Sequence, residues 1–388
     1  MSILSKLIEY HHPNGVESFL LGDLEDRGWL KLGRGKIISK KDMQATPGDY
    51  PVYSSSATGD GEIGRYGEYM FDDERITWSI DGGGKLFYRN NIKYSVTNVG
   101  GWIKVLNEQI NTKFLYYVLI EQWASKSFDY TKKAHPSVIR QEYIVPVPCV
   151  EIQNEICRIL DSFTSLISVL EKEHAYRIRQ FEYYKDYLLG SAGEEIELEK
   201  VCQIVDCPHT SPKWKDSGVP VIRNFNLVNG YIDTSNLSYV DEEEYQSRVK
   251  RIIPQKDDIM FSREAPIGNV GIVPEGFKCC QGQRVVLLRP NKEVISPIFL
   301  LHILQGGVIR EQIAKVEQIG STVSNFNISD LKKLKLHLPS LQIQDMITKK
   351  LAAFNDLCGN NAIGIPAEIR SRQAQYEYYR HYLLKFER

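Results

Sequence analysis

Long apolar stretches are missing from this sequence, and so is an excess of charge of either sign. No run approaches the roughly 18 apolar residues of a membrane span. The first residues, MSILSKLIEYHHPNG, lack the basic start and apolar centre of a secretory signal, so we predict a soluble, cytoplasmic protein. The 48 basic and 49 acidic residues leave a formal net charge of −1, so any surface for a polyanion such as DNA must be local.

Paired cysteines are missing too. The seven cysteines are an odd number, and they show neither the spacing of a disulfide framework nor the CxxC spacing of a zinc knuckle. Because persistent disulfides belong to oxidising compartments, we expect reduced thiols. The adjacent His11 and His12 have no carboxylate or cysteine close by in the sequence, which favours a solvated helix end over a metal site. We predict no metal site.

Motifs for covalent chemistry are the third absence. The segment GDGEIG, from Gly59 to Gly64, has the GxGxxG spacing, but it follows SSSAT in place of a buried strand, so we interpret it as a hairpin turn. DGGGK, from Asp81 to Lys85, lacks the Walker A spacing. No NPPY or DPPY methyltransferase signature, nuclease metal triad or helicase motif is present. We therefore predict that the chain is not itself an enzyme and binds no cofactor.

A repeated nonapeptide is the most informative feature that is present. FEYYKDYLL (Phe181 to Leu189) returns as YEYYRHYLL (Tyr376 to Leu384), and the two lie 195 positions apart (384 − 189), about half of the 388 residues. The likeness extends to VPVPCVEIQNEICRILDSFTSL (from Val145) and KLHLPSLQIQDMITKKLAAFNDL (from Lys335), in which a proline and an Ile-Gln pair coincide. The spacing indicates a duplicated chain.

The repeated segments have the periodicity of amphipathic helices. Apolar residues recur at steps of three and four in both copies. We predict one helix from about Glu151 to Leu189, ended by Gly190, and a second that is interrupted near Gly359 to Pro366. An antiparallel coiled coil between them is favoured over two unrelated surface helices. The residues assigned to helix pairing and partner docking are Ile152, Ile156, Phe163, Leu166, Tyr183, Tyr184, Tyr187, Ile343, Ile347, Phe354, Tyr378, Tyr379 and Tyr382.

Between the helices lie segments with the texture of β domains. Short β-branched and aromatic runs such as RITWSI and RVVLLRP alternate with Gly, Asn, Asp and Pro turns. The predicted class is α+β, with two β-rich domains joined by two long antiparallel coiled-coil helices in a pseudo-two-fold, circular arrangement. The predicted order is an N-terminal helix packing near the C-terminal helix (1–15), a first β-rich domain (16–147), a central spacer helix (148–190), a second β-rich domain (191–340) and a C-terminal spacer helix (341–388).

The loops of both domains carry residue types that read DNA. Arginine can pair bidentately with guanine and Asn or Gln with adenine, while lysines and hydroxyls hold phosphates. The plainer alternative is solvated loops, since acidic residues nearly balance the basic ones. The candidates in the first domain are Lys36, Lys40, Lys41, Ser54, Ser55, Ser56, Arg65, Trp78, Lys85, Arg89, Lys132 and Lys133. Those in the second are His209, Thr210, Ser211, Lys213, Trp214, Arg223, Asn224, Asn226, Arg263, Gln281, Gln283, Arg284, Thr322, Ser324 and Asn325.

The whole pattern resembles the specificity subunit of type I restriction-modification systems. The matching pieces are HHPNGVESFLLGDL, ITWSIDGGGKLFYRNNIKYSVTNVGGW, DDIMFSREAPIGNVGIV, IGSTVSNFNISDLKKLKLHLPSLQIQ and both Pro-led helices, which together span essentially the full chain. The resemblance implies that each β-rich domain is a target recognition domain for one half of an asymmetric, bipartite DNA site. It implies that the helices set the gap between the half-sites and dock two modification subunits.

The resemblance also implies where the chemistry lies. The modification subunits would carry an S-adenosylmethionine-dependent adenine methyltransferase, and restriction subunits would use ATP and Mg²⁺ for translocation and cleavage. Two other functions stay open at this point: a protein-interaction scaffold, and a self-contained DNA methyltransferase with an unfamiliar site.

Overall fold

The computed structural model describes residues 3–55, 59–81, 85–123, 125–126, 128, 132–190, 193–319, 326–359 and 362–386. The chain forms two compact units. Unit 1 consists of Met1–Glu171 and Ile369–Arg388, and unit 2 consists of Lys172–Glu368. Among the described residues, no helix has the length and apolar character needed to cross a membrane.

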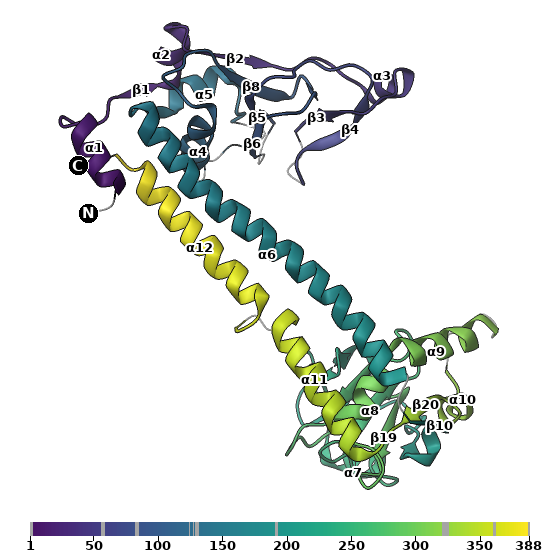
Figure 1. The fold of residues 1–388 in the computed structure, drawn as a ribbon. Coiled ribbons are helices and arrows are strands. Elements are labelled where there is room, and N and C mark those ends of the chain that lie inside the picture. The colour runs from purple at the N-terminus through teal and green to yellow at the C-terminus, as the bar shows by residue number, and fades with distance from the viewer. Residues whose placement is uncertain are drawn as a thin grey trace. The chain divides into compact units, whose positions relative to one another are not determined.

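Unit 1 is a set of small sheets with helices packed around them (Figure 1). Its four-stranded sheet has the order β2-β8-β5-β6, its three-stranded sheet the order β4-β3-β7, and β1 pairs with β9. The elements in chain order are α1 (Ile3–His11), β1 (Ser18–Leu20), α2 (Leu21–Asp26), β2 (Leu30–Arg34), α3 (Lys40–Ala45), β3 (Tyr50–Tyr53), β4 (Glu62–Tyr66), β5 (Arg75–Ser79), β6 (Leu86–Arg89), β7 (Ser95–Val96), β8 (Gly100–Val105), α4 (Thr112–Trp123), α5 (Pro136–Glu142), β9 (Ile144–Pro146) and α6 (Val150–Gly190).

Unit 2 repeats this plan after the second half of α6. Its four-stranded sheet has the order β11-β19-β16-β17, its three-stranded sheet the order β15-β12-β18, and β10 pairs with β20 and β13 with β14. The elements are β10 (Glu194–Glu197), η1 (Leu198–Lys200), β11 (Cys202–Val205), β12 (Val219–Ile222), η2 (Asn224–Asn226), β13 (Leu227–Val228), β14 (Tyr231–Ile232), β15 (Ser238–Val240), α7 (Glu242–Arg248), β16 (Ile259–Ser262), β17 (Val270–Ile272), β18 (Cys280–Gln281), β19 (Val285–Pro290), α8 (Pro297–Leu304), α9 (Gly307–Ile319), α10 (Ile328–Lys332), β20 (Lys335–Leu338) and α11 (Leu341–Gly359). The last helix, α12 (Ile365–Leu384), belongs to unit 1 from Ile369 onward.

The hydrogen bonds of the two units repeat residue by residue. The parallel pair β3–β7 matches Tyr53 with Val96, and the parallel pair β12–β18 matches Ile222 with Gln281. Just beyond, the N–H of Thr97 donates to Tyr53 O at 2.9 Å, and the N–H of Gly282 donates to Ile222 O at 2.8 Å. The duplication predicted from the helices therefore extends through the sheets, where the sequence itself shows little likeness.

The long helices pair as the periodicity predicts. α6 runs from Val150 to Gly190 and belongs to both units. In unit 1 its first half lies antiparallel to α12, where the rings of Phe163 and Tyr379 stack 5.3 Å apart. In unit 2 its second half lies antiparallel to α11, where the rings of Phe181 and Phe354 are 6.2 Å apart. The predicted interruption is confirmed, because α11 ends at Gly359 and α12 begins at Ile365.

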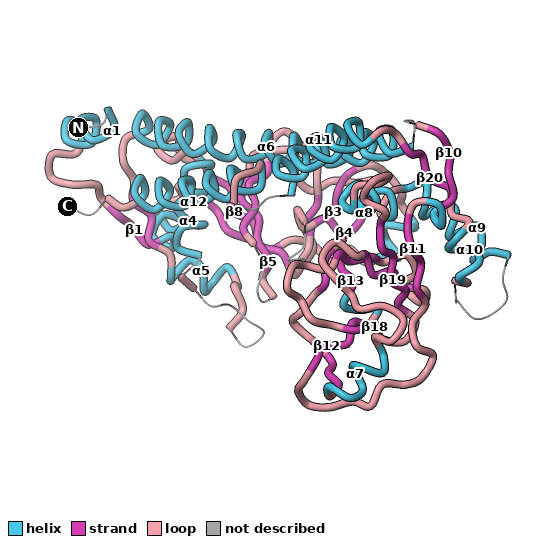
Figure 2. The backbone as a smooth tube through the Cα atoms, turned by 90° about the horizontal axis from the view of Figure 1, so that it is seen from below, coloured by secondary structure: helices cyan, strands magenta, loops and turns pink. Residues whose placement is uncertain are grey.

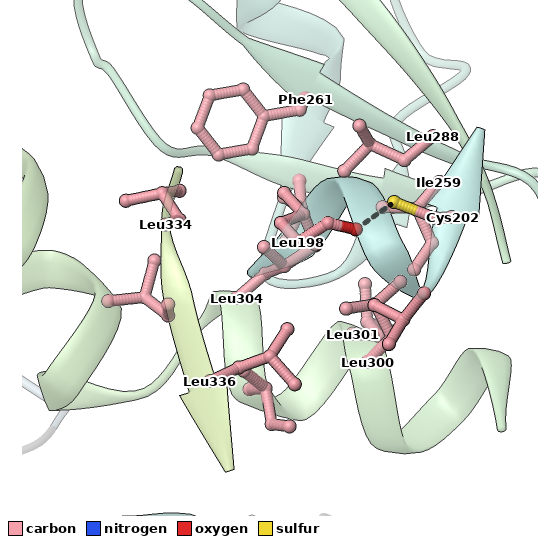
Figure 3. Packing of buried hydrophobic residues seen from close by; sticks show 14 of the residues in the cluster. Leu198, Cys202, Ile259, Phe261, Leu288, Leu300, Leu301, Leu304, Leu334 and Leu336 are labelled. Atoms are coloured by element: carbon pink, nitrogen blue, oxygen red, sulfur yellow. Dashed lines mark hydrogen bonds between the residues drawn. The ribbon is translucent and has the colours of Figure 1, made fainter. Parts of the chain in front are cut away.

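Buried apolar residues tie the helices to the sheets of each unit. In unit 2 the core gathers Leu198, Cys202 and Phe261 from the sheet region with Leu300 and Leu304 of α8 (Figure 3), and residues of α11 join the same core. In unit 1, α1 packs beside the end of α12, so both ends of the chain lie in that unit (Figure 1). The second sheet of unit 2, with α7 beside it, lies at the opposite end of that unit from α11 (Figure 2).

Candidate nucleic-acid interface

Four loops of unit 2 meet at one face. They follow β11, β12, β16 and β18, and each was picked out in the sequence for its polar residues. Gln283 Nε2 donates to Ser211 Oγ at 3.2 Å, which joins the fourth loop to the first. Asn224 Nδ2 donates to Ala265 O at 2.9 Å, which joins the second to the third. The structure therefore brings these predicted segments together.

A buried polar frame holds the loops in place. Arg263 lies inside the unit, where its Nη1 pairs with Asp206 at 2.8 Å and its Nε donates to Phe326 O at 2.8 Å. Arg248, on α7, is also buried; its Nε donates to Gln281 O at 3.1 Å and its Nη1 to Thr210 O at 3.2 Å. Buried polar groups need such partners because unpaired ones cost about 1–3 kcal/mol each.

Three residues that were predicted to contact DNA are instead buried parts of this frame. Asn226 is buried and donates to the carbonyls of Asp233 and Asn236 at 3.1 and 3.0 Å. Gln281 is buried and donates to Val205 O at 3.0 Å, and Arg263 is engaged as described above. Their polar groups are already used inside the fold, so these side chains position loops and do not face a ligand.

The turn after β18 contains a residue in a left-handed backbone conformation. Arg284 has φ of 71°, in the left-handed region that a non-glycine residue seldom adopts. Its N–H donates to the Sγ atom of the buried Cys207 at 3.1 Å, and its side chain pairs with Glu264. Burial raises the pKa of the Cys207 thiol, and the hydrogen bond from Arg284 only partly offsets that rise. Cys207 therefore acts as a neutral anchor for the turn.

The exposed residues of the face form the candidate surface. Trp214 and Phe225 flank Arg223, whose guanidinium carbon lies 5.5 Å from the first ring and 4.6 Å from the second. His209 Nε2 lies 3.4 Å from the carboxylate of Asp206. Phe225 was missed in the sequence, although an aromatic residue inside the polar run IRNFN is a usable signal. The predicted residues on this surface are His209, Thr210, Ser211, Lys213, Trp214, Arg223, Asn224, Gln283 and Arg284.

Unit 1 uses several predicted contacts for its own structure. Trp78 is buried, with its Nε1 donating to Ala134 O at 2.8 Å. Arg89 is buried with its guanidinium carbon 3.5 Å from the centre of the Tyr53 ring, and burial lowers the pKa of this arginine. Both are therefore core residues, which corrects their assignment to DNA contact. The hydroxyls of Ser54 and Ser55 are also engaged inside the unit, with Thr97 Oγ1 and Val99 O, each at 2.7 Å.

The predicted cations of unit 1 are exposed but dispersed. The backbone N–H of Lys36 donates to Val96 O at 3.0 Å, which places this lysine beside the strand edge that carries Ser54 and Ser55. Lys40 and Lys41 begin α3, and Lys85 precedes β6. Arg65, Lys132 and Lys133 form ion pairs with Glu62, Glu142 and Asp81 at 3.1, 2.7 and 2.8 Å. The predicted residues Ser56, Thr322, Ser324 and Asn325 lie outside the described part of the chain.

The predicted helix residues divide into buried and exposed sets. Ile152, Ile156 and Ile347 are buried in the cores, and Phe163 and Phe354 make the interhelical ring contacts. Leu166 and Ile343 are more exposed than the helix stripe predicts, at 39% and 40%. The predicted tyrosines are exposed, but two of them also take part in helix pairing: the Tyr379 ring stacks on Phe163 at 5.3 Å, and the Tyr184 ring lies 6.4 Å from Phe354. The more exposed tyrosines are Tyr183, Tyr187, Tyr378 and Tyr382.

The inner sides of the two nonapeptides differ. In unit 2, Asp186 Oδ1 accepts the N–H of Gly307, the first residue of α9, at 2.9 Å. In unit 1, Arg380 Nε and His381 Nδ1 both donate to Glu121 of α4, at 2.7 and 2.8 Å. Burial raises the pKa of Glu121, but these two hydrogen bonds outweigh it and hold the pKa below the ordinary value. Each helix is thus locked to its own domain by a different contact.

Two copies of one α+β frame, each with a paired long helix, make this a duplicated protein, and one copy carries the loop face described above. Comparison with known proteins gives the family. The chain belongs to the type I restriction modification DNA specificity domain family, whose model matches residues 13–178 and 192–371. The chain is 29% identical over 371 residues to the type I specificity subunit S.MpnORF507P of Mycoplasma pneumoniae, across 92% of this chain and 95% of that protein.

Solved structures share the fold. A chain from a study of complex assembly and conformational transition of the type I R-M system matches with a TM-score of 0.61 and 13% identity, over 96% of this chain and 98% of that one. The S subunit of a type I system from M. genitalium matches with a TM-score of 0.51 and 15% identity, over 97% and 98%.

Proposed function

We propose that this chain is the DNA-recognition subunit of a type I restriction-modification complex, and that each unit reads one half of a bipartite, asymmetric site. The observation that carries the proposal is the convergence of four polar loops on one face of unit 2, held by the buried Arg248 and Arg263. The same strand frame in unit 1, with different side chains on it, supports two half-sites of different sequence.

The partners follow from the same proposal. The paired helices dock two modification subunits and set the gap between the half-sites, in the circular arrangement that the duplication predicts. The modification subunits use S-adenosylmethionine to methylate adenine, and restriction subunits use ATP and Mg²⁺, while this chain binds no cofactor. Because the DNA and these partners are in the cytoplasm, the proposal places the chain there. The free state of all seven cysteines agrees with that compartment.

Methylation mapping tests the proposal. The full chain would be produced together with its cognate modification subunit, and methylated adenines would be mapped across a genome. We expect a gapped, asymmetric consensus. We also expect the logarithm of the binding constant to fall linearly with that of salt concentration, with a slope of about −0.9 per neutralised phosphate. Methylation by the complex without such a consensus would contradict the proposal.

A further inference from the structure

One arginine of the unit 2 face is held differently from the others. Arg223 lies between two aromatic side chains, Trp214 from the loop after β11 and Phe225 from η2, which are 47% and 41% exposed. A guanidinium close to aromatic rings is attracted by the ring quadrupoles, which favours this position of the side chain.

The other arginines of the face already have partners within the unit. Arg248 and Arg263 are buried and donate to backbone carbonyls, and Arg284 pairs with Glu264. Among the described residues, no carboxylate pairs with Arg223, and none accepts a hydrogen bond from its guanidinium. The N–H groups of its guanidinium therefore remain available to a ligand.

The backbone under Arg223 is fixed as well. Its N–H donates to Asn226 Oδ1 at 3.0 Å, and the buried Asn226 is tied to Asp233 O and Asn236 O. A side chain that is anchored at its base and held near two aromatic rings at its tip loses less rotamer entropy on binding than a free one. Its two parallel donors match O6 and N7 of guanine in the major groove, the pairing that distinguishes G·C from the other base pairs.

We infer that Arg223 reads a guanine in the half-site recognised by unit 2, with Trp214 and Phe225 as the residues that position it. The inference rests on the proposed function and names a specificity determinant within it. In unit 1 the corresponding residue is Ser54, which follows Tyr53 as Arg223 follows Ile222. The Ser54 hydroxyl is bonded to Thr97 Oγ1 at 2.7 Å, so unit 1 has no such reader at this place and the two half-sites differ there.

The test compares Arg223→Ala, Arg223→Lys and the matched control Arg310→Ala, an exposed arginine on α9. Each full chain, in complex with its modification subunit, is bound to duplexes that carry every base at every position of both half-sites. For both Arg223 variants we expect the preference for guanine to fall about 10- to 100-fold at one position of one half-site. The lysine keeps the charge but not the bidentate fork. The control keeps the full preference.

Replacing the rings tests the positioning role. Trp214→Leu and Phe225→Leu keep an apolar side chain but remove the aromatic face, so we expect a smaller loss of guanine preference at the same position and at no other. Unchanged discrimination between bases in the other half-site, which unit 1 reads, shows that each variant is folded and assembled.

Two results would overturn the inference. In one, Arg223→Ala weakens binding to all sequences equally and lowers the salt slope by about 1, while Arg223→Lys keeps the original affinity and salt slope. That pattern defines a phosphate contact. In the other, the Arg223 variants keep full preference at every position. Failure of the proposed function looks different, because the unsubstituted complex would then show no gapped consensus.

Discussion

Two buried glutamines, Gln153 and Gln344, make the same hydrogen bonds in the two units. Each donates to the carbonyl of the proline that precedes its long helix, Pro148 or Pro339, at 2.8 Å in both cases. Each also makes two hydrogen bonds with the loop before a domain helix, α4 in unit 1 and α8 in unit 2. Gln153 donates to Gln109 O and accepts from the Asn111 N–H. Gln344 donates to Val294 O and accepts from the Ser296 N–H. The glutamine of each Ile-Gln pair thus fastens a spacer helix to its domain.

Replacing Gln344 by an apolar residue of similar size tests its role in fastening α11 to unit 2. Gln344→Leu leaves the Ser296 N–H and two carbonyls without their partner inside the unit. Because each unsatisfied buried group costs about 1–3 kcal/mol, we expect a loss of about 2–5 kcal/mol, seen as a lower urea midpoint for unit 2. Gln342→Leu, an exposed change two residues earlier on α11, should shift the midpoint little. Equal shifts of the urea midpoint for the two variants would contradict this role of Gln344.

At the scale of the element, the two nonapeptides present the same outward face. Tyr183 and Tyr187 stack 6.4 Å apart at 8°, and Tyr378 and Tyr382 stack 6.3 Å apart at 4°. Their exposed fractions are also matched, at 67% and 59% in the first copy and 65% and 58% in the second. A groove lined by Phe163, Gln375 and neighbouring residues adjoins the second pair. Repeated exposed aromatic patches are typical of interaction surfaces.

These tyrosine pairs predict the stoichiometry of the complex. If each pair docks one modification subunit, the double change Tyr183→Ala with Tyr187→Ala should leave one modification subunit bound instead of two. The same is expected for Tyr378→Ala with Tyr382→Ala. Native mass spectrometry of the purified complex would measure this, with Tyr231→Ala, a 70% exposed tyrosine on β14, as the control. Two subunits retained by both double variants would rule the patches out as docking sites.

At the scale of the whole molecule, the duplication places two specificity domains on one chain. α6 contributes its first half to unit 1 and its second half to unit 2, and it is continuous over 41 residues. A helix advances 1.5 Å per residue, so its length is a fixed quantity once its ends are fastened to the domains. A single chain with two non-identical domains suits an asymmetric, gapped site.

Shortening α6 tests its role as the spacer. Deleting residues 165–168 removes about 6 Å and slightly more than one turn. We expect methylation mapping to show an altered gap between the half-sites or no activity at all. Replacing the same four residues by alanine keeps the helix and its length, so that variant should keep the original gap. An unchanged gap with full activity after the deletion would contradict a spacer role.

Much of the fold was predictable from the sequence because its signals are local or repeated. The 3.6-residue periodicity and a terminal glycine gave α6 nearly to the residue, and Gly359 and Pro366 marked the break in the second copy. The repeated nonapeptide indicated the duplication. The family followed from the order of these parts, and none of this required knowledge of which residues meet in space.

The sequence by itself determined the duplicated plan, the paired helices and the loops that could read DNA. Only the tertiary structure decided which polar side chains in those loops face outward. Arg263 and Arg223 look alike as loop arginines, yet the first is buried against Asp206 and the second lies exposed between two aromatic rings. Burial depends on neighbours that are distant in the chain, and Asp206 and Arg263 are 57 residues apart. A local sequence pattern therefore does not predict which of the two arginines is buried.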